Sequence, residues 1–129
     1  MKAGLVAAVV SGAPSTAYAL AAGRDPLEAT KVAGTLLVGE HAPAWLQLTA
    51  AVPVHLTLSI GWAAAIERVL PPRRRVLFGT AAGLAIAALD LGVLGRRRTA
   101  IRALPLGPQL ADHALFGAVV GLLSDRGRS

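Results

Sequence analysis

Four long apolar stretches occupy most of this 129-residue chain and limit what it can fold into. They cover residues 3–22, 44–66, 76–94 and 104–123, so each is 19 to 23 residues long. An α-helix that crosses about 30 Å of hydrocarbon needs roughly 20 apolar residues. Because hydrocarbon offers no partners for backbone polar groups, such stretches cross it as internally bonded helices. We therefore predict an all-α integral membrane bundle of four transmembrane helices, with residues 1–129 as one domain.

The charged residues gather at the ends of these stretches. They make up 16% of the chain against 54% hydrophobic residues, whereas a soluble bundle carries charges along every helix. Two arginine triplets, 73–75 and 96–98, directly flank apolar stretches, where arginine anchors helix ends at lipid headgroups. Aromatic residues for base stacking are few, so no nucleic-acid partner is expected. The expected location is a cell membrane, inner or plasma, crossed several times.

The positive charges do not set an orientation in that membrane. If both termini lie on one side, that side carries seven positive residues and the other carries six. The positive-inside rule cannot orient a bundle on so small a difference, so insertion in both orientations stays open. The seven are Lys2, Arg68, Arg73, Arg74, Arg75, Arg126 and Arg128, and the six are Arg24, Lys31, Arg96, Arg97, Arg98 and Arg102.

The first stretch permits two further interpretations. Pro14, near its middle, predicts a kink, and a sharper hypothesis is a broken helix that lines a site. Lys2, the apolar run after it and the triplet at 17–19 also fit a cleaved signal peptide, which would leave three transmembrane helices.

A shorter helix is expected between the first two spans, at about 26–38. Asp25 suits an N-cap, Pro26 suits the first helical position, and Glu28 completes a capping box. The pattern stops at Gly39, which makes the helix too short to span. We predict an interfacial amphipathic helix, with a re-entrant segment as the alternative.

Small residues recur every four positions along the spans. The third contains Gly79 and Gly83, and the fourth contains Gly117 and Gly121. A G-x-x-x-G spacing lets two helix backbones approach closely in lipid, so these glycines are candidate helix-packing residues. Small-residue faces on short helices also predict a homo-oligomer.

Four ionisable residues lie inside or near the predicted hydrocarbon: His55, Asp90, Asp112 and His113. A charge there costs at least ~2.5–3.5 kcal/mol, so such residues face the bundle interior and pair. One interpretation is a structural or accessory protein whose polar network, for example Asp112 with His55, fixes helix register. The alternative is a small proton- or ion-coupled transporter or channel protomer that uses His55, Asp112 and His113. Asp90 could instead pair with an arginine at the interface, Arg97 or Arg102.

The sequence gives little reason to expect a cofactor or an enzyme. No cofactor is predicted, although a haem held between His55 and His113 is a further hypothesis, since histidine is a standard axial ligand. The spacing of the other candidate ligands matches no known metal motif. No nucleotide-binding, kinase, hydrolase or metalloprotease motif occurs, and the absence of cysteine removes thiolate chemistry.

Four segments carry a resemblance to a protein group. They are SGAPST at 11–16, GRDPLEAT at 23–30, AALDLG at 87–92 and DHALFG at 112–117. In these segments the chain resembles uncharacterised small four-span membrane proteins of actinobacteria. The resemblance covers nearly the whole chain and implies four transmembrane helices, but it implies no activity.

Overall fold

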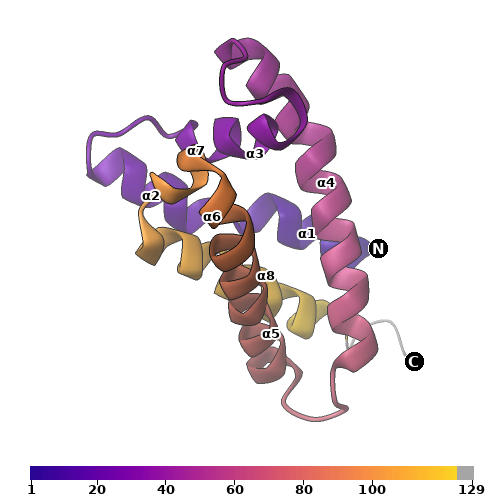
Figure 1. Ribbon diagram of the computed structural model, residues 1–129. Coiled ribbons are helices and arrows are strands. Elements are labelled where there is room, and N and C mark those ends of the chain that lie inside the picture. The colour runs from indigo at the N-terminus through magenta and orange to yellow at the C-terminus, as the bar shows by residue number, and fades with distance from the viewer. Residues whose placement is uncertain (125–129) are drawn as a thin grey trace.

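The computed structural model describes residues 1–124, and this part of the chain consists of helices and short connections without a strand (Figure 1). Arg126 and Arg128 lie outside it. In chain order, the helices are α1 (Lys2–Val10), α2 (Ala13–Ala21), α3 (Glu28–Val38), α4 (Ala44–Val69), α5 (Arg75–Leu89), the π-helical turn η1 (Asp90–Leu94), α6 (Gly95–Arg97), α7 (Thr99–Arg102) and α8 (Leu106–Leu123).

Four helical segments in the described part are long and apolar enough to cross a membrane. They are Lys2–Ala21, Ala44–Val69, Arg75–Arg97 and Leu106–Leu123. The predictions of an all-helical chain and of four membrane-length helices are confirmed. The boundaries differ most at the C-terminal ends of the second and third spans, which continue three residues further, to Val69 and Arg97.

The first candidate span is interrupted near its middle. α1 ends at Val10 and α2 begins at Ala13, with Pro14 in the first turn of α2. Proline has no backbone N–H and its ring excludes the carbonyl four residues earlier, so the helix breaks on the N-terminal side of Pro14. The predicted kink is therefore present as a break at Ser11 and Gly12, which leaves unpaired helix ends in the middle of the span.

The third candidate span changes from α-helical to π-helical geometry at a position that no sequence pattern indicated. α5 ends at Leu89, and the five residues Asp90–Leu94 form one π-helical turn before α6 continues. Such widened turns are rare and are concentrated at functional sites. Asp90 is the first residue of this turn: its N–H still bonds to the Ile86 carbonyl, as in an α-helix, and its own carbonyl accepts the wider bond from the Gly95 N–H.

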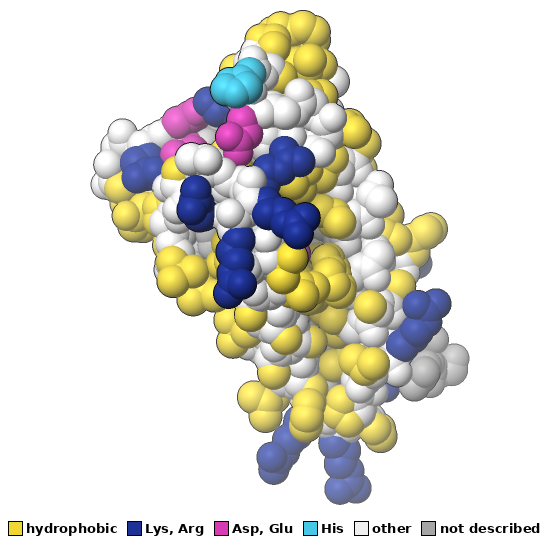
Figure 2. Space-filling model, in the orientation of Figure 1, with side chains coloured by type: hydrophobic (Ala, Val, Ile, Leu, Met, Phe, Trp, Pro, Cys, Tyr) yellow, Lys and Arg dark blue, Asp and Glu magenta, His cyan; other side chains and the backbone are white. Residues whose placement is uncertain are grey.

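The spans alternate in direction, as short connections require. The Ser124 hydroxyl at the end of α8 lies 3.5 Å from the Glu67 carboxylate near the end of α4. A Cβ on Gly4, at the start of α1, would lie 3.0 Å from the Ala63 side chain in the same half of α4. The opposite end of the molecule carries α3, α6 and α7 (Figure 1). Lys and Arg side chains accordingly gather toward two ends, with mainly hydrophobic and small side chains between them (Figure 2).

A close and extensive helix contact joins α5 to α8. A Cβ on Gly117 would overlap the Gly79 carbonyl oxygen and would lie 3.0 Å from the Gly83 nitrogen. A Cβ on Gly121 would meet the backbone of Arg75 in the same way. Because backbone atoms cannot move aside as side chains can, only glycine permits this approach. The structure thus brings together all four glycines that the sequence singled out.

The short helix α3 differs from the prediction at its start. Asp25 Oδ1 accepts a hydrogen bond from the Leu27 N–H at 2.9 Å, as a cap does, but the helix begins only at Glu28. Glu28 does not close a capping box, because its carboxylate pairs with Arg24 at 2.9 Å. α3 packs directly on α4, where a Cβ on Gly34 would overlap the Gln47 carbonyl. Its placement at a membrane interface stays a prediction.

Candidate functional site

A cavity of about 680 Å³ lies between the broken first span, α3, α4, η1 and α8. All four ionisable residues that the sequence singled out line it: His55 from α4, Asp90 from η1, and Asp112 and His113 from α8. Protein interiors are normally packed with few voids larger than a water molecule. A partly open cavity of this size, lined by all four ionisable residues, is therefore the candidate functional site.

His55 binds the broken end of α1. Its Nε2 lies 2.7 Å from the Ala8 carbonyl oxygen. A carbonyl oxygen only accepts hydrogen bonds, so Nε2 carries the hydrogen and donates it. Ala8 lies in the last turn of α1, where carbonyls lack donors within the helix. His55 therefore supplies the hydrogen-bond donor that the Ala8 carbonyl lacks because the first span is interrupted after Val10.

Asp112 binds the other side of the same break. Its Oδ1 accepts a hydrogen bond at 2.9 Å from the backbone N–H of Ser15, in the first turn of α2. The first N–H groups of a helix lack internal partners and favour a negative charge beside them. The hydrogen bonds of Asp112 and His55 thus go to these backbone groups and not directly to each other, as the example of a network had expected. His55 instead donates to the Ala8 carbonyl and Asp112 accepts from the Ser15 N–H, two backbone groups on either side of the break.

Asp90 and His113 form the third polar contact, at a distance of 3.3 Å between Oδ2 and Nε2. The other ring nitrogen of His113, Nδ1, donates to the Gln109 carbonyl at 2.8 Å. A hydrogen bond between Nε2 and the carboxylate therefore needs one more proton, carried either by the imidazole or by the Asp90 carboxyl. In addition to the hydrogen on Nδ1, Asp90 and His113 therefore share one proton, which lies between Oδ2 and Nε2. Sequence reasoning had left Arg97 and Arg102 open as partners of Asp90.

The three contacts each join two different spans. Ala8 with His55 connects the first span to the second, and Ser15 with Asp112 connects the first to the fourth. Asp90 with His113 connects the third to the fourth. Sequence reasoning missed the backbone partners at Ala8 and Ser15, and Pro14 was the available signal, because a proline break exposes backbone groups on both of its sides.

Both histidines of the haem hypothesis have protein partners in this structure. The Nε2 atom of His55 contacts the Ala8 carbonyl and the Nε2 atom of His113 contacts the Asp90 carboxylate, and the haem itself stays a hypothesis. Among the described residues, no group of three or more His, Asp or Glu side chains is placed to hold a metal ion.

The remaining lining of the cavity is mostly apolar. Trp62 and Phe116 contribute aromatic rings, and Ser11, Thr16 and Ser59 contribute hydroxyls. No Lys or Arg of the described chain lines the cavity. α3 lines one end of the cavity. Arg98, between α6 and α7 at the same end of the molecule, donates to the Thr35 carbonyl of α3 at 3.1 Å.

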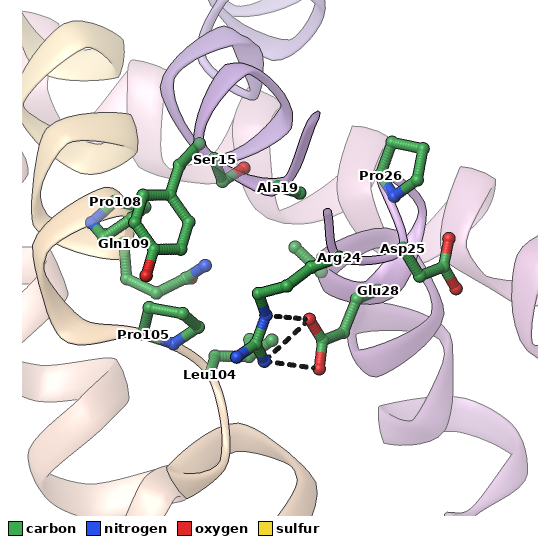
Figure 3. A pocket seen from close by; sticks show the side chains of 12 residues that line it. Ser15, Ala19, Arg24, Asp25, Pro26, Glu28, Leu104, Pro105, Pro108 and Gln109 are labelled. Atoms are coloured by element: carbon green, nitrogen blue, oxygen red, sulfur yellow. Dashed lines mark hydrogen bonds and ion pairs between the residues drawn. The ribbon is translucent and has the colours of Figure 1, made fainter. Parts of the chain in front are cut away.

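A second, much smaller pocket of about 20 Å³ adjoins the cavity and shares Ser15 and Gln109 with it. In Figure 3, Arg24 is directed at the Glu28 carboxylate, and Pro105, Pro108 and Gln109 form the opposite wall. The pocket lies where α2, the start of α3 and the start of α8 meet. Its charged residues belong to the connection between the first two spans.

Asp25, beside this pocket, provides a prediction on pH. The hydrogen bond from Lys31, and after it the bond from the Leu27 amide, hold the pKa of Asp25 below its ordinary value of 3.8. Lys31→Ala is expected to raise this pKa toward 3.8, as measured by a carboxyl-carbon NMR titration in micelles. A folded-state pKa below the unfolded one stabilises the fold above about pH 3.8, and this stabilisation disappears as the pH falls through the folded-state value. Arg24→Ala is the control, since Arg24 binds Glu28. An Asp25 pKa unchanged by Lys31→Ala would contradict the assigned cause.

Comparison with protein-family models, curated proteins and solved structures finds no match to this chain.

Proposed function

We propose that this protein is a small proton-coupled transporter protomer of a cell membrane, in which protons bind at the side chains around the central cavity. One observation carries the proposal: four ionisable residues far apart in the sequence line a single cavity between candidate membrane spans. Ionisable side chains at such depth are costly, and in membrane proteins they mark proton and substrate pathways.

The surface supports the membrane part of this proposal. Large apolar side chains on the candidate spans are exposed, for example Val9 at 83% and Val69 at 74%. A soluble protein rarely leaves so many large apolar groups in contact with water, whereas lipid chains cover them without cost. The bilayer and a second copy of the chain are the partners we expect.

The cavity supports the transport part. A polar network that only fixes register gains most from complete packing, because an unfilled cavity lowers stability. Here the cavity is partly open, and Asp112 and the Asp90–His113 pair both line it. A pair that holds one proton beside a second carboxylate is an arrangement that proton movement can use.

Proton flux tests the proposal directly. In liposomes with an interior-negative potential, the wild-type protein should acidify the interior well above the rate of protein-free liposomes, as reported by a trapped pH dye. Asp112→Asn should lower the flux at least about tenfold, because Asn still accepts the Ser15 N–H but cannot carry the proton. Glu67→Gln is the matched control, since this carboxylate lies near the end of α4 and outside the cavity. Wild-type flux no faster than the background would overturn the proposal.

A second function, that of a structural or accessory membrane protein, is favoured by a different observation. Each of the three polar contacts joins two spans, which is what a network that fixes helix register does. On this interpretation Asp112→Asn leaves growth and every flux unchanged and only lowers the stability of the bundle.

A further inference from the structure

The cavity has an electrostatic character that the proton pathway alone does not explain. Asp90 is balanced by His113, with which it shares a proton, and His55 satisfies the Ala8 carbonyl without needing a charge. Asp112 is bound by a backbone N–H, which carries no formal charge, and no Lys or Arg of the described residues lines the cavity. When ionised, Asp112 therefore brings a negative charge that no Lys or Arg among the described lining residues neutralises, and the two histidines of the lining already have other partners.

The walls around this charge are apolar and aromatic. Trp62 and Phe116 line the cavity, together with aliphatic side chains such as Val52, Leu56 and Leu104. The faces of Trp and Phe attract cations, and they do so more strongly where water is excluded. Leu104 and Leu56 would suit the hydrocarbon part of a ligand, whereas an inorganic ion would gain nothing from them.

The size of the cavity also points to a molecule rather than an ion. Small-molecule sites in proteins measure about 300–1,000 Å³ and are mostly apolar, with a few placed polar groups. The volume here, about 680 Å³, lies within this range. A dehydrated metal cation would occupy only a small part of it.

We propose that the cavity binds lipophilic organic cations, with Asp112 as the counter-ion and Trp62 and Phe116 as the aromatic wall. The proposal rests on the proposed function in one respect, since it assigns a ligand class to the same cavity. The cation can be a free solute or the ammonium headgroup of a lipid that enters from the bilayer, because both offer a positive charge attached to an apolar body.

Binding of tetraphenylphosphonium to the purified protein in uncharged detergent micelles, followed by calorimetry, tests this inference. The wild type should bind this cation but not tetraphenylborate, which has the same shape and the opposite charge. Asp112→Asn should weaken the binding at least about tenfold, and Glu67→Gln should leave it unchanged. No binding, or binding that Asp112→Asn leaves intact, would overturn the inference.

A pair of glycine variants separates loss of the cavity from loss of the charge. Gly12 lines the cavity, and a Cβ built on it meets nothing within 4 Å, so Gly12→Leu fills the space without disturbing the backbone or any ionisable residue. It should abolish cation binding. Gly61→Leu adds the same side chain to α4 where a Cβ also meets nothing, outside the cavity lining, and should not change binding. Equal binding by both variants would contradict the cavity as the binding site.

Two further measurements distinguish the sources of the cation and separate this inference from the proposed function. If short-chain phosphatidylethanolamine competes with tetraphenylphosphonium, the site binds lipid ammonium groups. If it does not compete, the site binds free cations. Both results support a cation site. Cation binding by a protein without proton flux overturns only the proposed proton pathway. Proton flux in a protein that binds no cation overturns only the present inference.

Discussion

Gly117→Leu is expected to destabilise the bundle by about 3 kcal/mol, the largest effect of any single change considered for this chain. The new side chain would have to occupy the space of the Gly79 carbonyl and of the Gly83 nitrogen, which lies 3.0 Å from a Cβ at this position. Neither group can turn away without breaking α5, so the two helices must separate. The free energy of unfolding from a reversible detergent titration, followed by circular dichroism, measures the loss.

Gly107→Leu is the control for this prediction. Gly107 lies on the same helix, α8, but a Cβ built on it meets nothing within 4 Å. Its substitution should leave stability nearly unchanged, or should raise it slightly because leucine favours the helix more than glycine does. If Gly117→Leu proved as stable as Gly107→Leu, the close contact of α5 with α8 would not exist in the folded protein.

The second large effect is expected from the Asp90–His113 pair. His113→Leu removes the partner of the Asp90 carboxylate, and a carboxylate left alone in hydrocarbon costs about 2.5–3.5 kcal/mol. The two side chains are 31% and 23% exposed, so this range is an upper bound for the loss of stability. Adding Asp90→Leu should recover much of the loss, because the double variant leaves neither group without a partner.

A double-mutant cycle in the same detergent titration measures this coupling. We expect an interaction free energy of about 1–2 kcal/mol between Asp90 and His113. His41→Leu is the control, since His41 lies in the connection between α3 and α4, outside the cavity lining. Losses for the two single variants that simply add in the double variant would show that the residues do not interact.

These two predictions concern one mechanical unit. A Cβ on Gly83 would overlap the His113 carbonyl and lie 3.2 Å from the Gly117 nitrogen, so the glycines of α5 and α8 set how near His113 comes to the third span. Asp90, the first residue of the π-helical turn, meets the His113 ring from the third span. The glycine contact and the proton-sharing pair are therefore coupled. A substitution that separates α5 from α8 should also weaken the contact between Asp90 and His113.

Much of the fold could be predicted from the sequence because the relevant signals are local. The length of an apolar stretch decides whether a helix can span, and four-residue spacing decides which glycines share a face. The break near Pro14 follows from the missing N–H of one residue. The cost of ionisable groups in hydrocarbon was enough to select His55, Asp90, Asp112 and His113, all of which line the cavity.

The tertiary structure alone decided which groups these residues bind. Ser15 and Asp112 are separated by 97 positions in the sequence. Their contact depends on the rotation of α2 and α8 about their axes and on the relative axial position of the two helices. Pairing by charge suggested Asp112 with His55, but the broken first span offered each of them a backbone group that had lost its helical partner. The π-helical turn at Asp90 likewise leaves no mark in composition or spacing. The sequence by itself thus determined which segments are helical and which ionisable side chains would gather at one site. The relative rotation of the helices, which no local signal encodes, determined the partners of those side chains and left the cavity between the helices.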